Sequence, residues 1–111
     1  IPGNMRDGVV ITEGLGNQDY LSSASHGAGR KMSRSKAFST LDPDSFKQDM
    51  KDIICSTNIS ILDESPRAYK DFEYILDLQK NVVIKIISRV SPIINIKGEG
   101  DSRKYKKIRK A

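Results

Sequence analysis

The residues best suited to chemistry lie in SHGAGRKMSR, residues 25–34, which contains the only histidine of the chain. A neutral imidazole can attack phosphorus as well as transfer protons. The glycines beside His26 would let a phosphate approach the backbone, whose N–H groups can hold its oxygens. Arg30 and Arg34 are four residues apart, so they would share a helical face and clamp phosphate oxygens. The stretch predicts phosphoryl or nucleotidyl transfer at His26, against the alternative of a surface histidine beside solvated cations.

The composition predicts one small domain with a thin core. Of 111 residues, 30% are charged and 6% are aromatic, so we expect one layer of helices against a small sheet. The net charge of +5 is concentrated in residues 30–36 and 103–110, which suits a phosphate-bearing partner. The single cysteine, Cys55, cannot form an internal disulfide, and a reducing, cytoplasmic setting is the expectation. No apolar run approaches the ~20 residues of a membrane span, so no membrane association is expected.

Three helices are predicted from their capping residues. Ser33 can cap a short helix that begins directly after it. Asp42 followed by Pro43 predicts a second helix, which we expect to end near Cys55. Asp71 predicts a third helix, one side of which would be formed by Phe72, Ile75, Leu78 and Gln79.

Short β-branched runs predict the strands. We expect strands over residues 8–12, 82–90 and 93–97, and a further short strand or extended segment over 58–62. No helical or strand period survives between the first strand and the first helix, so His26 is expected on a loop or a strand end. Together these elements predict an α/β fold of the mixed α+β type, with helices packed on short strands.

Several other polar residues favour structural roles. Cys55 is interpreted as a small apolar filler at the end of a helix. Asp63 and Glu64 favour a capping or turn role over metal binding. Tyr69 is expected to pack against the sheet rather than stack on a base. Residues 99–111 form a basic tail, for which a solvated run and RNA contact both remain open.

Four blocks of the sequence, in this order, resemble the C-terminal part of RtcB-type RNA ligases: PGNM at 2–5, SHGAGRKMSR at 25–34, LDESPRAYKD at 62–71 and INIKG at 94–98. The resemblance covers nearly the whole chain up to Gly98. It implies that residues 1–98 are the C-terminal portion of an RtcB-like catalytic domain and that 99–111 lie beyond it. The chain is therefore expected to be a piece of a longer protein.

The resemblance implies a GTP- and Mn²⁺-dependent enzyme of tRNA splicing and RNA repair. Such ligases join RNA 3′-phosphate or 2′,3′-cyclic phosphate ends to 5′-hydroxyl ends. By the resemblance, His26 would take GMP as a phosphoramidate, and Arg30 and Arg34 would meet phosphates of the nucleotide or the RNA. Lys97 would read the guanine base. The other residues implied to border GTP or GMP are Pro2, Gly3, Met5, Gly27, Ala28 and Gly29.

Two departures from the family pattern bear on function. Several family members have a serine near the position of Val9 that contacts guanine, and valine cannot make that hydrogen bond. The family's metal ligands, a cysteine and several histidines, lie upstream of the matched region, and Cys55 does not correspond to that cysteine. No residue of this chain is therefore assigned to metal, and Mn²⁺ is expected to be held by the remainder of the ligase chain.

Two other functions compete with the ligase. A non-catalytic remnant would bind nucleotide or RNA through its basic residues without reaction, and the missing metal ligands favour it. A small basic ribonucleoprotein-like module would need aromatic residues for base stacking, and the basic tail offers only Tyr105. That reading ranks last.

Overall fold

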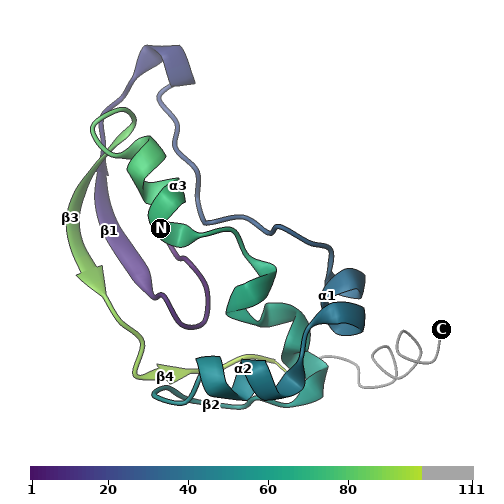
Figure 1. Cartoon of the computed structure of the whole chain (residues 1–111). Coiled ribbons are helices and arrows are strands. Elements are labelled where there is room, and N and C mark those ends of the chain that lie inside the picture. The colour runs from purple at the N-terminus through teal and green to yellow at the C-terminus, as the bar shows by residue number, and fades with distance from the viewer. Residues whose placement is uncertain (99–111) are drawn as a thin grey trace.

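The computed structural model describes residues 1–98, which form two small layers around two apolar clusters. The tail over 99–111 lies outside the described residues. Figure 1 shows one layer built on strands β1 and β3 with helix α3, and another where β2 and β4 lie beside helices α1 and α2. The predicted mixture of helices and short strands is confirmed.

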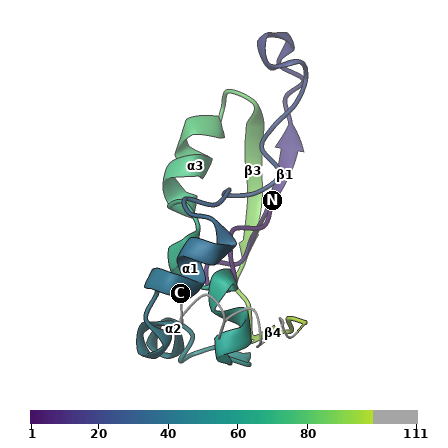
Figure 2. The same cartoon turned by 90° about the vertical axis from the view of Figure 1, so that its right-hand side faces the viewer.

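The first layer is an antiparallel pair covered on one face by a helix. Strand β1 (Val9–Gly14) pairs with β3 (Ile84–Val90), with a register irregularity between Ile11 and Thr12. Helix α3 (Phe72–Gln79) lies on one face of this pair, as Figure 2 shows. The apolar cluster between them, the β1–β3 cluster, is formed by Val10, Ala28, Phe72, Leu76, Val83 and Ile84.

The second layer packs short helices around a separate cluster. It contains α1 (Arg34–Thr40), α2 (Pro43–Asp49), and the parallel pair β2 (Ile54–Cys55) and β4 (Ile94–Asn95). The 3₁₀ helices η2 (Ile59–Glu64) and η3 (Pro66–Ala68) complete it, and η1 (Gln18–Tyr20) lies apart, after β1. The apolar cluster of this layer, the α1–α2 cluster, has the buried residues Met5, Phe38, Phe46, Met50, Ile61 and Leu62.

The capping predictions are confirmed. The side chain of Ser33 accepts a hydrogen bond from the Lys36 N–H at 3.1 Å, and Asp42 accepts one from the Ser45 N–H at 3.1 Å. Asp71 likewise accepts from the first turn of α3. Each cap satisfies an N–H group that the first helical turn leaves unpaired, which is why the starts of these helices can be predicted.

Three predictions about the elements are wrong. Helix α2 ends at Asp49, and the residues around Cys55 form β2 because they pair with β4. Residues 58–62 are not extended, since the Asn58 side chain accepts from the Ser60 N–H and begins a 3₁₀ helix. On α3, Phe72 and Gln79 are buried as predicted, but the other buried residue is Leu76, and Leu78 is exposed. Within residues 1–98, no helix has the length and apolar character needed to cross a bilayer.

Candidate functional site

A pocket of about 560 Å³ brings together four segments that are far apart in the sequence. The segments are 2–9, 26–30, 64–69 and 92–97, so the lining draws on both layers of the fold. Of the sequence-predicted site residues, those that line it are Pro2, Gly3, Met5, His26, Gly27, Ala28, Gly29, Arg30 and Lys97. Arg34 is the only predicted site residue that does not line it.

The backbone around His26 is fixed on both sides while its imidazole is exposed. Ser25 donates its N–H to Oε1 of Gln79 at 2.9 Å. On the other side, Ala28 is buried, and the carbonyl of Gly29 accepts from the Lys70 N–H at 2.9 Å. Within residues 1–98 the imidazole has no hydrogen-bond partner. The expectation that His26 lies on a loop is confirmed. The loop places the His26 imidazole at the pocket.

The turn of residues 2–8 forms another wall of the pocket. Gly3 donates its N–H to the Gly8 carbonyl at 2.8 Å, and Asn4 Oδ1 accepts from the Asp7 N–H at 2.9 Å. Met5 is buried in the α1–α2 cluster, and its carbonyl accepts from Asn95 Nδ2 at 3.2 Å. The turn is thereby tied to β4, the strand that leads to Lys97.

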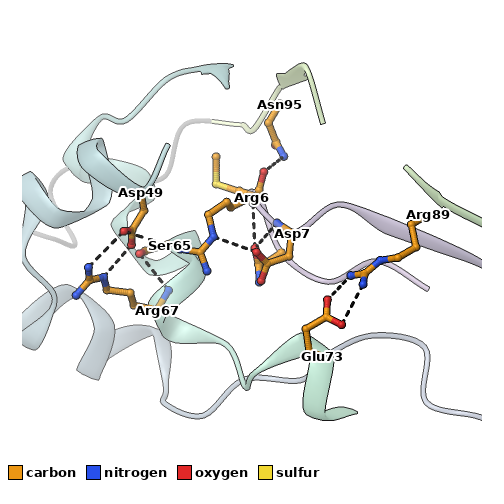
Figure 3. A network of polar contacts seen from close by, with 10 residues as sticks. Arg6, Asp7, Asp49, Ser65, Arg67, Glu73, Arg89 and Asn95 are labelled. Atoms are coloured by element: carbon orange, nitrogen blue, oxygen red, sulfur yellow. Dashed lines mark hydrogen bonds and ion pairs between the residues drawn. The ribbon is translucent and has the colours of Figure 1, made fainter. Parts of the chain in front are cut away.

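Ion pairs brace the outer side of this turn, as Figure 3 shows. Arg6 donates to Asp7 at 3.0 Å and lies 3.9 Å from Asp49, which also accepts from Arg67 at 2.8 Å. Burial acts to raise the pKa of Asp7, but hydrogen bonds from Arg6 and Asn4 outweigh it and hold that pKa below its usual value. Asp49 on α2 thus joins the pocket turn to η3.

Arg30 lines the pocket and has a donor that no described residue uses. It forms an extended bridge with Tyr69, and its guanidinium lies 5.1 Å from the centre of the Tyr69 ring. Nε donates to the Met32 carbonyl at 3.1 Å, and Nη1 donates to the Tyr69 hydroxyl at 3.4 Å. Nη2 is buried without a hydrogen-bond partner. An anion at this position would satisfy a donor that the described chain leaves unpaired.

The predicted common helical face of Arg30 and Arg34 is wrong. Arg30 is extended, and only Arg34 is helical, as the first residue of α1. Arg34 Nη1 lies 2.7 Å from Asp63 and 2.5 Å from Glu64, and these two acids raise the pKa of the Arg34 guanidinium. Its charge is already compensated, so it differs from Arg30. The assignment of Arg34 to phosphate stays a prediction.

Glu64 is the one acid among the described residues that line the pocket. Its Oε2 accepts from the Tyr69 hydroxyl at 2.8 Å and lies 3.6 Å from Lys97 Nζ. Burial acts to raise the pKa of Glu64, but the hydrogen bonds from Arg34 and Tyr69 hold it below its usual value. Burial and the neighbouring Glu64 carboxylate raise the pKa of the Tyr69 phenol.

The structure corrects two further interpretations and leaves one standing. Tyr69 does not pack as a sheet filler, since it lines the pocket against Arg30. Asp63 and Glu64 pair with Arg34 rather than cap a helix. Cys55 packs against the α1–α2 cluster as an apolar filler, although it lies on β2, and burial raises the pKa of its thiol.

Sequence reasoning missed four residues of the site. Glu64 and Tyr69 lie in the LDESPRAYKD block but were assigned to the scaffold, because a turn acid and a lone tyrosine carry no distinctive spacing. Asn95 could have been found, since it is two residues from Lys97 on an extended segment and shares its face. Gln79 gave no signal, because its contact with Ser25 joins positions 54 residues apart.

No metal centre is formed by the described part of the chain. Among residues 1–98, no group of three or more His, Cys, Asp and Glu side chains could hold a metal ion. Divalent cations of this kind need several such ligands, so these residues do not fit a Mn²⁺ site.

Comparison with known proteins finds one family throughout. The sequence model of the family described as tRNA-splicing ligase RtcB matches residues 1–98. The chain is 35% identical over 98 residues to the RNA-splicing ligase RtcB of Escherichia coli. The aligned region covers 88% of this chain and 24% of that protein. It is 35% identical over 105 residues to the tRNA-splicing ligase RtcB of Nanoarchaeum equitans, covering 88% of this chain and 22% of the relative. The chain thus spans about a quarter of the length of these curated relatives.

Proposed function

The chain belongs to the RtcB family of tRNA-splicing ligases, and we propose that it forms the nucleotide-binding portion of a GTP-dependent RNA ligase. The ligase joins RNA 3′-phosphate or 2′,3′-cyclic phosphate ends to 5′-hydroxyl ends. The observation that carries the proposal is the pocket, which gathers the four family-like blocks around one exposed imidazole. Membership of the family does not establish a cellular location. A cytoplasmic location is proposed because a single cysteine cannot form an internal disulfide and suits a reducing compartment.

His26 is the proposed nucleophile. One imidazole nitrogen attacks the α-phosphorus of GTP, a P–N bond forms, and the P–O bond to pyrophosphate breaks. The GMP is then transferred to the RNA 3′-phosphate, which regenerates the imidazole, and the 5′-hydroxyl displaces GMP. The exposed imidazole and the fixed backbone on both sides of it support this role, because a nucleophile must be both accessible and oriented.

The phosphates are proposed to lie against Gly27, Gly29 and Arg30. Gly29 has a φ of +77°, which a side chain would strain, and glycine leaves this backbone open to a ligand. The buried, unpaired Nη2 of Arg30 supports a phosphate contact, since a bound oxygen would supply the missing acceptor. Ala28 packs into the β1–β3 cluster and anchors the loop beneath them.

The guanine base is proposed to lie at the Lys97 side of the pocket. The lysine ammonium can donate to the guanine carbonyl oxygen, which adenine lacks. Pro2, Gly3, Met5 and Val9 line the same pocket. Val9 offers only apolar contact, so Lys97 is the proposed source of discrimination between bases.

Manganese is proposed to be supplied by ligands in the rest of a longer ligase chain. The described residues do not fit a Mn²⁺ site. RNA enters the proposal as the substrate class, on the strength of the family to which the chain belongs.

The test is intact-protein mass spectrometry of the complete ligase incubated with GTP and Mn²⁺. We expect a GMP adduct that is lost on acid treatment, as a phosphoramidate should be, and that is absent from His26→Gln. A matched His26→Asn variant should also lack it, while both variants keep the thermal stability of the unsubstituted protein. An acid-stable adduct, or one that survives His26→Gln, would place the nucleophile elsewhere. Nucleotide binding without any adduct would favour the non-catalytic remnant.

A further inference from the structure

An acidic side chain stands in a pocket that is otherwise suited to an anion. Glu64 lines it together with Arg30 and Lys97, and no other acid among the described residues does so. A carboxylate repels phosphates, so its presence requires a separate reason.

The contacts of Glu64 explain its presence. Oε1 accepts from Arg34 Nη1 at 2.5 Å, and Oε2 accepts from the Tyr69 hydroxyl at 2.8 Å. Lys97 Nζ lies 3.6 Å from the same Oε2. Two partners hold the carboxylate in place, and the third is the residue proposed to read the base.

We propose that Glu64 is a positioning residue for base selection, which holds the Lys97 ammonium at the wall of the pocket. This inference rests on the proposed function, because it concerns how the same pocket selects guanine. Glu64 acts through Lys97 and need not touch the base.

The reason lies in the freedom of a lysine side chain. Lys97 follows β4, and its side chain is 38% exposed, so without a partner its flexible stem would sample solvent. The Glu64 side chain is only 16% exposed, which limits screening of the pair. A fixed negative charge therefore confines the donor before the nucleotide arrives, and pre-organisation of this kind improves affinity.

Ionisation of Glu64 at neutral pH is consistent with this role. Hydrogen bonds from Arg34 and Tyr69 hold its pKa below the usual value in spite of its burial. The carboxylate is thus charged under the conditions in which the pocket would work.

The chain offers a matched control in the preceding residue. Asp63 pairs with Arg34 at 2.7 Å, as Glu64 does, but it has no contact with Lys97 or Tyr69. Glu64→Gln and Asp63→Asn each remove one carboxylate from Arg34. Only Glu64→Gln also removes the charge that faces Lys97.

The experiment measures the dissociation constants of GMP and AMP for the complete ligase by calorimetry. We expect Glu64→Gln to weaken GMP roughly tenfold and to leave AMP unchanged, because one charged donor loses its position. Asp63→Asn should keep the ratio of the two constants. In a Lys97→Met background, Glu64→Gln should cause no further loss, since the two residues act through one contact.

Several results would overturn the inference. Equal effects of Glu64→Gln and Asp63→Asn would assign the role to Arg34, and additive effects of Glu64→Gln and Lys97→Met would remove the link to the lysine. GMP binding with an unchanged GMP to AMP ratio in Glu64→Gln would overturn this inference alone. If the unsubstituted ligase binds no GMP, the proposed function fails and this inference falls with it.

A second measurement needs no nucleotide. Nitrogen-15 relaxation of the Lys97 ammonium should report faster motion in Glu64→Gln than in Asp63→Asn. Unchanged motion of Lys97 in Glu64→Gln would overturn the positioning role even if selectivity had changed.

Discussion

The backbone N–H of Ser25 donates a hydrogen bond to Oε1 of Gln79 at 2.9 Å, which ties the residue before His26 to the end of α3. The Gln79 side chain is buried, and its Nε2 donates to the Ile75 carbonyl at 3.2 Å. A side chain held by its own helix thus fixes a loop that has no regular structure of its own.

Gln79→Leu is predicted to slow GMP transfer to His26 while GMP affinity changes little. Leucine keeps most of the volume but removes the acceptor, so the Ser25 N–H loses its partner at a cost of about 1 kcal/mol. The imidazole would then sample more orientations, which penalises reaction more than binding. Single-turnover adduct formation gives the rate, and calorimetry gives the affinity.

Gln79→Glu serves as the control for this prediction. It keeps an acceptor for Ser25 but loses the donor to Ile75, so its rate of adduct formation should stay closer to that of the unsubstituted ligase. A Gln79→Leu variant with an unchanged rate would show that the loop needs no such tether.

Gly3→Ala is predicted to destabilise the protein through a clash with the core. An added Cβ would lie 2.5 Å from Cδ1 and 2.8 Å from Cε1 of the Phe72 ring, which is buried and cannot swing away. Overpacking of this kind costs about 1–3 kcal/mol. Chemical denaturation monitored by circular dichroism measures the change in the free energy of unfolding.

Gly27→Ala is the matched control, since it also adds one methyl group to the pocket wall. Its Cβ would meet only the Pro2 carbonyl oxygen, at 3.4 Å, so the free energy of unfolding should change far less. Comparable losses in the two variants would contradict a specific Gly3–Phe72 contact.

Tyr69 is predicted to ionise at a higher pH than a tyrosine side chain free in water. Burial first, and then the Glu64 carboxylate that accepts its hydroxyl, raise the Tyr69 pKa above its ordinary value of 10.0. A raised pKa means that the hydroxyl contributes stability below pH 10.0, and that this contribution is lost as the pH rises through the folded-state value. Ultraviolet absorbance of phenolate during a pH titration measures the Tyr69 pKa, and the part of the signal that is lost in Tyr69→Phe identifies this residue.

Glu64→Gln should lower the apparent pKa of Tyr69, because the negative acceptor is gone. The Glu64 carboxylate behaves in the opposite sense to the phenol. Its folded-state pKa is lowered, so its stabilising contribution is present above its ordinary value of 4.5 and is lost as the pH falls through the folded-state value. A Tyr69 titration that is indifferent to Glu64→Gln would contradict the contact between them.

Local signals made the helix starts predictable, and tertiary pairing made other elements unpredictable. Ser33, Asp42 and Asp71 each cap a helix through contacts within three residues, so the information lies in the sequence itself. Ile54 and Cys55 instead take their strand conformation from residues forty positions later, which an apolar spacing compatible with a helix cannot reveal.

The same division holds for the candidate site. A distinctive motif led to His26 and its glycines, and the pocket does contain them. Arg34 was grouped with Arg30 on helical spacing, but α1 begins only at Arg34, and its carboxylate partners come from η2. The contacts of Glu64 also cross between elements, so its place in the pocket required the fold.

Lys31 and Lys70 are predicted to bind the RNA backbone beside the pocket. Both line a second, polar hollow of about 380 Å³, next to the HGAGR loop, and neither forms an ion pair within residues 1–98. The Lys70 ammonium lies 3.8 Å from where a Cβ on Gly29 would be, so its charge reaches the proposed phosphate side of the site. Free lysines that contact phosphates release counterions, which makes binding depend on salt.

The double variant Lys31→Gln with Lys70→Gln should therefore bind single-stranded RNA more weakly and with a flatter salt dependence. Each lost phosphate contact reduces the magnitude of the negative slope of log K against log salt by about 0.7, so the slope should flatten by about 1.4. Fluorescence anisotropy of a labelled RNA at several salt concentrations measures it, with residues 99–111 retained in every variant. Lys80→Gln is the matched control, because Lys80 pairs with Asp77 at 3.5 Å and lines neither hollow. A slope that flattens half as much in Lys80→Gln would indicate only the loss of general positive charge, and an unchanged slope in the double variant would place the RNA on another face.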